Sequence, residues 1–187
     1  VYDEERGGMF DVSRMKDIDK ACDRVWKAID DGEKICLYAD YDADGVPAAT
    51  ISYEFFKKIG YADNVSVTIP HRHKDGFGLH DHLIDEMKKE QVSLLITMDL
   101  GISNIEQVDH ANSLGIDVII TDHHMPHEEL PKAFAILNPK QSDCRYGEKM
   151  LCGSGVMYKF IQRLTEQARQ KKYDIHVGWE KWLLDMV

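Results

Sequence analysis

Short apolar runs alternate with amphipathic segments along the chain, and this alternation constrains the fold more than any other feature. The strand-like runs span residues 34–39, 65–70, 94–98, 118–121 and 134–137. The segments with helical spacing of apolar residues span 17–29, 46–59, 80–91, 102–114 and 155–171. Strands that alternate with helices across short turns form βαβ units. We therefore predict an α/β fold, with a mostly parallel five-stranded sheet and helices on both faces.

The first strand-like run ends in "ADYDADGV", where Asp40, Asp42 and Asp44 alternate with other residues before a glycine. The pattern DxDxDG also opens an EF-hand calcium loop, but that loop follows a helix and needs a bidentate acid at its twelfth position. Counted from Asp40, that position is Ile51, and the preceding run "KICLYA" is strand-like. An EF-hand is therefore excluded.

Two further strand-like runs end in similar residues: "TMDLGIS" delivers Asp99, and "TDHHMP" delivers Asp122, His123 and His124. The carboxyl ends of parallel strands meet at one edge of the sheet, where the functional crevice lies. Singly, these residues also fit structural roles, such as a helix cap at Asp44 or a turn at Asp99. Jointly, buried carboxylates repel one another unless a cation compensates them. We therefore predict a metal site at this edge.

The ligand types indicate which metal this site would take. Aspartates with one or two imidazoles suit Mn²⁺ or Mg²⁺, and the imidazole favours Mn²⁺. The four cysteines have no CxxC spacing, which argues against a structural zinc. Several acids can bridge two ions about 3.5 to 4 Å apart, an arrangement that activates water for displacement at phosphorus. We predict a phosphoester hydrolase with two Mn²⁺ ions, and with Mg²⁺ as the alternative.

The net charge of −10 argues against binding of nucleic acid by bulk electrostatics. This objection weakens if many of the acids serve a metal site, or if a basic surface belongs to another part of a longer protein. No stretch approaches the roughly 18 uninterrupted apolar residues that a membrane span needs. We expect a cytoplasmic protein without a membrane partner.

The quoted motifs also resemble a known family. "ADYDADGV", "TMDLGIS" and "TDHHMP", in this order and spacing, resemble the first three motifs of the DHH phosphoesterase superfamily. "IPHRHKDGFGLH" and "ILNPKQSDCRYGEKMLCGSGVMYKF" resemble the PxRxxxGYGL and NPK segments of RecJ-like single-strand-specific exonucleases. The resemblance runs from about Phe10 to the last residue. It implies a Rossmann-like DHH domain and a 5′-to-3′ exonuclease on single-stranded DNA, acting in DNA repair and recombination. The implied partners are single-stranded DNA and a single-strand-binding protein or replication proteins.

The resemblance also implies roles for individual residues. The implied metal ligands lie at the three strand ends and are Asp40, Asp42, Asp99 and His123. Asp42 and Asp99 are the better candidates for bridging two ions. His124 matches a histidine near the metal and the scissile phosphate. Asp44 and Asp122 match supporting acids of the catalytic group, one directed toward a helix start and one toward a histidine ring nitrogen.

Other residues are candidates for binding substrate. Arg72 lies in the loop after the second strand, where a guanidinium can hold a phosphate with two hydrogen bonds, and His71 beside it adds positive charge. A solvated loop arginine is the alternative. Gly153 and Gly155 precede the long helix, where exposed amides can bind phosphate or form a tight packing turn. Phe77 fits either a stacking platform for a base or a buried loop anchor.

The sequence departs from the family pattern in two places. Tyr38 stands where many RecJ-like proteins have a histidine, so we expect one metal to be held more weakly or with an extra water. The family's fourth motif, an aspartate in a "TVAD"-like strand, should follow shortly after "LLDMV". We therefore expect residues 1–187 to be a DHH domain truncated before that motif, without the C-terminal DHH-associated and nucleic-acid-binding domains. Such an isolated fragment should be inactive.

Two alternative functions stay open from the sequence. A DHH phosphatase or phosphodiesterase on small substrates, such as pyrophosphate, short oligoribonucleotides or cyclic dinucleotides, fits the first and third motifs equally well. The PxR and NPK segments favour the RecJ-like interpretation over it. A degenerate DHH domain that binds without cleaving is supported by Tyr38 and the missing fourth motif. The intact aspartates and histidines of the first three motifs argue against it.

Overall fold

The computed structural model describes residues 2–3 and 8–187. Residues 1 and 4–7, which belong to the start of the predicted 1–187 domain, lie outside the described residues. A five-stranded sheet forms the centre of the molecule, and all of its neighbouring strands pair in parallel. Its strands are β3 (Lys34–Ala39), β4 (Val65–Thr68), β5 (Val92–Met98), β6 (Asp117–Thr121) and β7 (Ala135–Leu137). The predicted α/β class is confirmed, and the sheet is parallel throughout. Two short strands, β1 (Tyr2–Asp3) and β2 (Gly8–Met9), pair antiparallel outside this sheet.

The strands lie in the order β4-β3-β5-β6-β7. The chain starts inside the sheet at β3, adds β4 on one side and then continues on the other side from β5. The order therefore reverses between β3 and β5, which makes this pair the topological switch point of the sheet. The register holds the two strands level, with Leu37 opposite Ile96 and Ala39 opposite Met98. As a result, the residues that follow β3 and β5 emerge side by side.

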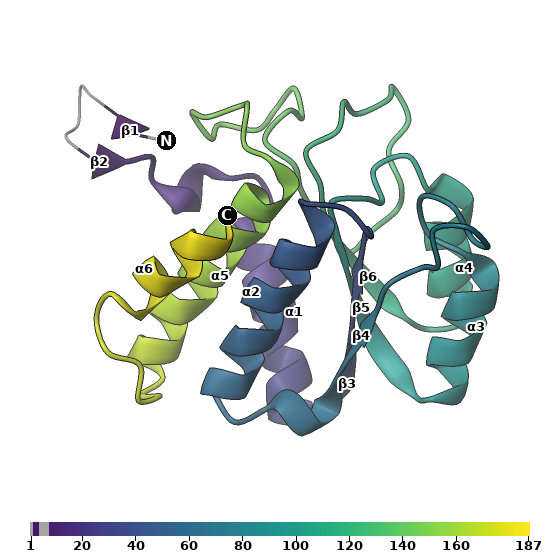
Figure 1. Cartoon of the computed structure of the whole chain (residues 1–187), viewed down its shortest axis with the longest axis horizontal. Helices are drawn as coiled ribbons and strands as arrows, with labels where there is room; N and C mark the ends of the chain where they lie inside the picture. The colour runs from purple at the N-terminus through teal and green to yellow at the C-terminus, as the bar shows by residue number, and fades with distance from the viewer. Residues whose placement is uncertain (1, 4–7) are drawn as a thin grey trace.

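Helices cover both faces of the sheet, as predicted (Figure 1). One face carries α1 (Ile18–Asp31), α2 (Gly45–Lys58), α5 (Gly153–Gln170) and α6 (Trp179–Leu183). The other carries α3 (Asp81–Lys89) and α4 (Ile105–Ser113). Three short 3-10 helices complete the described elements, η1 (Val12–Arg14), η2 (Ala62–Asn64) and η3 (Leu184–Met186). Within the part of the chain that the structure describes, no helix is both long and apolar enough to cross a bilayer.

Four strands, β3, β5, β6 and β7, contribute alternate side chains to two hydrophobic cores, whereas β4 adds only the half-buried Val65 to one of them. Ile35 and Leu37 of β3 pack under α1, α2 and α5, whereas Cys36 and Tyr38 pack under α3 and α4. Since both faces are covered, the strands read as continuous apolar runs, which is typical of parallel sheets. Packing on both sides fixes the strand ends, and the long loops gather at the carboxyl edge, at the top of Figure 1. A rigid sheet therefore carries the predicted site.

Candidate metal centre

The carboxylates of the first motif lie directly beyond β3. Asp40 is only 6% exposed, and its Oδ1 accepts a hydrogen bond from the amide of Tyr41 at 2.7 Å. Asp42 Oδ1 accepts from the amides of Asp44 and Gly45, at 2.8 and 2.9 Å, where α2 begins. A Cβ at position 45 would lie 2.3 Å from the carbonyl oxygen of Asp40, so only glycine fits there. The close turn holds Asp40 and Asp42 at the end of the strand.

Asp99 lies beyond β5 in a strained conformation. Its φ of 63° is left-handed, which is uncommon for an aspartate and concentrates at functional sites. The side chain is 2% exposed, and Oδ1 has no hydrogen-bond partner among the described residues. A buried carboxylate oxygen without a donor costs stability unless something else binds it. This oxygen of Asp99 is therefore suited to bind a cation.

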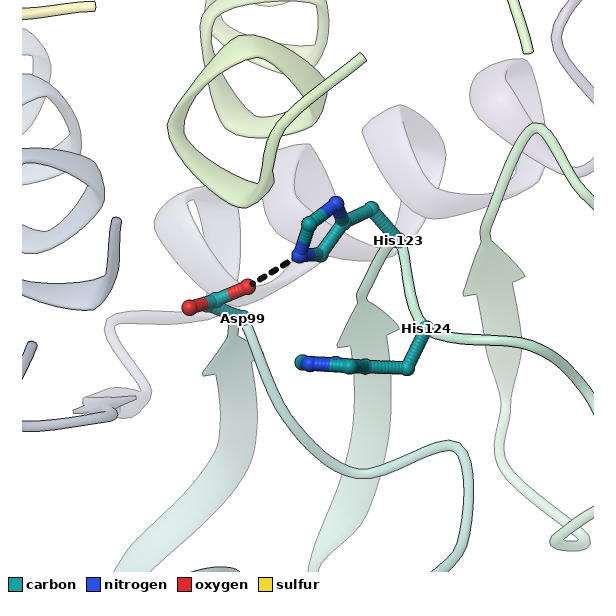
Figure 2. A group of neighbouring side chains, drawn as sticks. All are labelled: Asp99, His123 and His124. Atoms are coloured by element: carbon teal, nitrogen blue, oxygen red, sulfur yellow. Dashed lines mark ion pairs between the residues drawn. The ribbon is translucent and has the colours of Figure 1, made fainter. Parts of the chain in front are cut away.

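The two histidines extend from the end of β6 toward Asp99 (Figure 2). His123 Nε2 lies 3.2 Å from Asp99 Oδ1, while its Nδ1 lies 3.1 Å from the carbonyl oxygen of Leu151. A carbonyl only accepts, so Nδ1 carries the proton and the Nε2 lone pair faces the carboxylate oxygen. Two acceptors at this distance repel one another unless a cation or a proton lies between them. Asp99 and His123 therefore have the chemistry of two metal ligands.

Asp122 organises the second histidine. Its Oδ1 lies 2.7 Å from His124 Nδ1 and accepts hydrogen bonds from the amides of His123 and His124. Its Oδ2 accepts from the amide of Ile102 at 2.9 Å. Asp122 is buried, and both of its carboxylate oxygens accept hydrogen bonds. It thereby fixes the orientation of the His124 ring. The predicted contact between Asp122 and a histidine ring nitrogen is present.

Ligand atoms of these side chains converge into two overlapping groups. Asp40, Asp42 and Asp99 each offer an oxygen within 4.8 Å of the others, and the same separation holds among Asp99, His123 and His124. Asp99 belongs to both groups. Carboxylates with imidazole suit Mn²⁺, whereas Mg²⁺ prefers oxygen alone. The residues present therefore fit a divalent metal.

The proton affinities reflect the same crowding. Burial, followed by the charges of Asp42 and Asp44, raises the pKa of Asp99 to about 8. Burial also raises the pKa of Asp40. Burial acts the same way on Asp42, but the amides of Gly45 and Asp44 outweigh it and lower the pKa of Asp42. The hydrogen bond to Asp122 raises the pKa of His124. The centre thus combines a carboxyl that resists ionisation with an imidazole that favours protonation.

A pocket of about 360 Å³ opens beside these groups. Its lining includes Asp40, Asp42, Asp99, Asp122 and His124. Phe77 and Gly78 from the β4–α3 loop and residues 100–104 after β5 complete the lining. A molecule bound in this pocket would lie against the candidate ligands.

Asp44 has a different partner from the one that its position suggests. It occupies the N-cap position of α2, yet its side chain makes no capping hydrogen bond there. Instead it accepts from the amide of Gly153 and the hydroxyl of Ser154, both at 3.2 Å, at the start of α5. The helix start that Asp44 serves is therefore that of α5, and Asp42 takes the capping role at α2.

Gly153 and Gly155 have a packing role in the structure. Both are buried at the start of α5, and a Cβ on Gly153 would lie 2.2 Å from Asp99 Oδ1. The amide of Gly153 donates to Asp44, and that of Gly155 lies 3.4 Å from Cys152 Sγ. Both amides are therefore engaged within the chain, and the phosphate-binding role of these glycines stays a prediction. The tight turn brings α5 against the carboxylates.

Arg72 and His71 lie outside the ligand cluster, on the exposed β4–α3 loop. The Arg72 guanidinium lies over the Tyr41 ring, 4.7 Å from its centroid. Tyr41 in turn contacts Phe77, with ring centroids 5.1 Å apart, and Phe77 is 76% exposed. His71 Nδ1 accepts from the amide of His73 at 3.2 Å, so this histidine orders its own loop. Arg72 thus borders the site, and the interpretation of Phe77 as a buried anchor is wrong.

Two contacts of the histidine loop had no local signal in the sequence. The carbonyl of Leu151 fixes the His123 tautomer across 28 residues. The side chain of Asn138 is fully buried and donates to the His124 carbonyl oxygen at 2.9 Å. In the sequence, only the resemblance to the NPK pattern marks the segment that contains Asn138. Both contacts depend on how the loops after β6 and β7 pack together.

A parallel sheet that gathers aspartates and histidines at its switch point defines a metal-binding α/β domain. The model of the DHH family, N-terminal domain, matches residues 34–187. The chain belongs to this family.

The chain is also similar to characterised proteins. The single-stranded-DNA-specific exonuclease RecJ of Salmonella typhimurium is 38% identical over 92% of the chain, and that of Bacillus subtilis is 39% identical over 89%. The chain spans 29% and 21% of the length of these relatives, respectively.

Two solved structures show the same fold with a metal. A crystal structure of exonuclease RecJ bound to manganese matches 92% of this chain and 47% of its own chain, with a TM-score of 0.74 and 26% identity. The Mn²⁺ complex of RecJ from Thermus thermophilus matches 83% of this chain and 22% of its own, with a TM-score of 0.69 and 27% identity. These neighbours support dependence on a divalent metal.

Proposed function

We propose that this chain is the DHH domain, residues 1–187, of a RecJ-like exonuclease that hydrolyses phosphodiester bonds of single-stranded DNA from the 5′ end. The observation that carries the proposal is the position of Asp99, which is shared by two groups of candidate ligands at the switch point. Similarity to single-stranded-DNA-specific exonucleases supports the choice of substrate. Action in DNA repair and recombination, and a single-strand-binding or replication protein as partner, belong to the same proposal.

The proposed metal ligands, which would hold two Mn²⁺ ions or Mg²⁺ as the alternative, are Asp40, Asp42, Asp99 and His123. Asp42 and Asp99 would be shared between the ions. When bound, divalent cations at such a site supply activation of water and neutralisation of charge on the phosphate. The protein contributes fixed geometry. Asp40 and Asp42 are held by backbone amides and His123 by the carbonyl of Leu151, so the ligands need little rearrangement to bind.

His124 takes a separate role in the proposal. Its Nδ1 is engaged with Asp122, and the ring lines the pocket beside Asp99. An imidazolium held in this way donates a hydrogen bond to a phosphate oxygen, or a proton to the departing oxygen. Asp44 supports the arrangement from the start of α5 and lies 3.8 Å from His123 Nε2. Arg72, on the rim, binds the phosphate backbone of the strand.

An assay of the complete gene product with Mn²⁺ tests this function. Single-stranded DNA labelled at either end, pyrophosphate and a dinucleotide serve as substrates, and chelation of the metal serves as the blank. We expect release of nucleotides from the 5′ end of DNA that stops on chelation. Preference for pyrophosphate or the dinucleotide would replace the proposal with a small-substrate phosphatase. Tight binding of DNA without cleavage would replace it with a binding domain.

A further inference from the structure

Tyr38 lies two residues before Asp40 on the same strand, yet its hydroxyl is engaged away from the ligand cluster. The side chain is fully buried in the core beneath α3 and α4. Its hydroxyl donates a hydrogen bond to the carbonyl oxygen of Gly78, at 3.0 Å and 40 residues further along the chain. The sheet is thereby tied to the β4–α3 loop at one defined point.

Gly78 also lies close to the side chain of Asn104, the residue that precedes α4. Its φ is +89°, and a Cβ there would lie 2.9 Å from the side-chain nitrogen of Asn104. The neighbouring residue Leu79 is buried in the same core as Tyr38. The Gly78 carbonyl thus accepts from the Tyr38 hydroxyl, and its Cα lies close to the Asn104 side chain. A larger residue does not fit at this position.

Phe77, the residue before Gly78, carries an exposed aromatic ring beside the pocket. Phe77 is 76% exposed and lines the pocket that contains Asp99 and His124. Glycines with positive φ flank it on both sides, Gly76 at +83° and Gly78 at +89°. Two such residues make the loop tip flexible unless another contact fixes it. The Tyr41 ring contacts Phe77 itself, and the hydrogen bond from Tyr38 adds a restraint on the backbone of the next residue.

We propose that Tyr38 is a positioning residue for substrate: its hydroxyl fixes Gly78 and so holds Phe77, with Arg72 on the same loop, at the mouth of the metal pocket. The inference rests on the proposed function for the identity of the substrate, which is a single strand of nucleic acid. An ordered ring at the pocket mouth loses less conformational entropy when a base packs on it. The hydroxyl thus acts on substrate affinity and leaves the metal ligands unchanged.

The variant Tyr38→Phe tests the restraint, because it keeps the ring and removes only the hydroxyl. Tyr158→Phe is the matched control: Tyr158 is also buried, and its hydroxyl has no partner among the described residues. Hydrogen exchange of residues 71–80 should become about three- to ten-fold faster in Tyr38→Phe, as expected for the loss of one neutral hydrogen bond. Exchange in β3 and α2 should stay unchanged, and Tyr158→Phe should match the wild type. Unchanged exchange in residues 71–80 would overturn the proposal.

The functional measurement uses the complete gene product. Tyr38→Phe should raise the KM for single-stranded DNA about three- to ten-fold, with kcat and Mn²⁺ affinity within about two-fold of wild type. A fall in Mn²⁺ affinity or in kcat at unchanged KM would instead place Tyr38 in the metal centre and refute its role on the loop. If the wild type does not cleave DNA, the proposed function fails. The role of Tyr38 is then decided by the affinity of the Mn²⁺-loaded protein for a labelled oligonucleotide, which should weaken to the same extent in Tyr38→Phe and would overturn the role if unchanged.

Discussion

Acidic side chains have different partners at the two edges of the sheet. At the amino edge, the Arg24 side chain is 5% exposed and donates to Asp117 and Glu33, both at 2.6 Å. Ser93 adds a hydrogen bond to the same Glu33 oxygen at 2.6 Å. At the carboxyl edge, acids face acids and histidines. Among the described residues, no lysine or arginine forms an ion pair with Asp40, Asp42, Asp44 or Asp99.

The pKa values record the difference. Burial opposes ionisation of Glu33, but hydrogen bonds from Ser93 and Arg24 outweigh it and lower the pKa of Glu33. Burial and the neighbouring acids raise the pKa of Asp99 to about 8. At the amino edge the acids are therefore paired with a cation of the chain itself, although Arg24 Nη1 has no hydrogen-bond partner among the described residues. At the carboxyl edge, no lysine or arginine among the described residues pairs with these acids, so this edge fits a bound cation.

The largest expected effect comes from the same substitution at each edge. Asp42→Asn in the complete gene product should lower hydrolysis by more than about 100-fold, because an amide is a weak ligand and cannot bridge two cations. Asp117→Asn at the amino edge should retain activity close to wild type. Far-ultraviolet circular dichroism would show that both variants are folded. Similar activity of the two variants would remove the distinction between the edges.

Arg24→Met tests whether the amino edge stabilises the fold. The substitution leaves Asp117 without Arg24 and leaves Glu33 with Lys27 at 3.8 Å, so we expect the free energy of unfolding to fall by about 1 to 3 kcal/mol. The lower part of that range reflects the partial exposure of Asp117, which is 47% exposed. Urea denaturation measures the loss. Mn²⁺ affinity should be unchanged, and a loss of metal binding would link the two edges.

The exposed rim of the site should respond more weakly. Arg72→Ala removes one phosphate contact, so affinity for single-stranded DNA should fall roughly three- to ten-fold, with a shallower salt dependence. Lys74→Ala, on the same loop, controls for charge alone, because no ring contact holds the Lys74 side chain among the described residues. Equal effects of both variants would assign Arg72 to general electrostatics, and fluorescence anisotropy across a salt series would distinguish them.

A further expected effect is a pH dependence of metal-free stability. The unfolded chain releases the Asp99 proton near an ordinary pKa of about 3.9, whereas the folded chain retains it up to a pKa of about 8. Between these values the folded state binds more protons, so the Asp99 contribution to stability falls as pH rises. The Tm of Asp99→Asn should therefore exceed that of wild type by a margin that grows from about pH 5 to 8, at about 2 to 4 °C per kcal/mol. A constant margin would contradict the raised pKa.

Sequence reasoning succeeded where local patterns decide the structure. The apolar runs predicted all five strands of the sheet to within a few residues, because strands buried on both faces are continuously apolar. The convergence of Asp40, Asp99 and His123 followed from parallel topology alone, since carboxyl ends share one edge. These inferences needed no knowledge of which loops touch.

The contacts that the sequence did not predict join distant segments. Asp44 bonds to Gly153 across 109 residues, and Arg24 reaches Asp117 across 93. Neither pair has a local spacing that marks it, because the partners are set by loop packing and by the opposite edge of the sheet. Asp44 at a helix start looked like an ordinary cap, and only the approach of α5 shows its actual partner.

Calorimetric titration of Mn²⁺ into the wild-type chain and into Asp99→Asn tests the central claim most directly. The claim is that the carboxyl edge is a divalent metal centre built around Asp99. Wild type should take up Mn²⁺ with saturable heat and a rise in Tm. Asp99→Asn should be at least as stable without metal, because it removes the buried unpaired carboxylate, and should show neither response to Mn²⁺. Equal Mn²⁺ binding by both proteins, or none by either, would contradict the account.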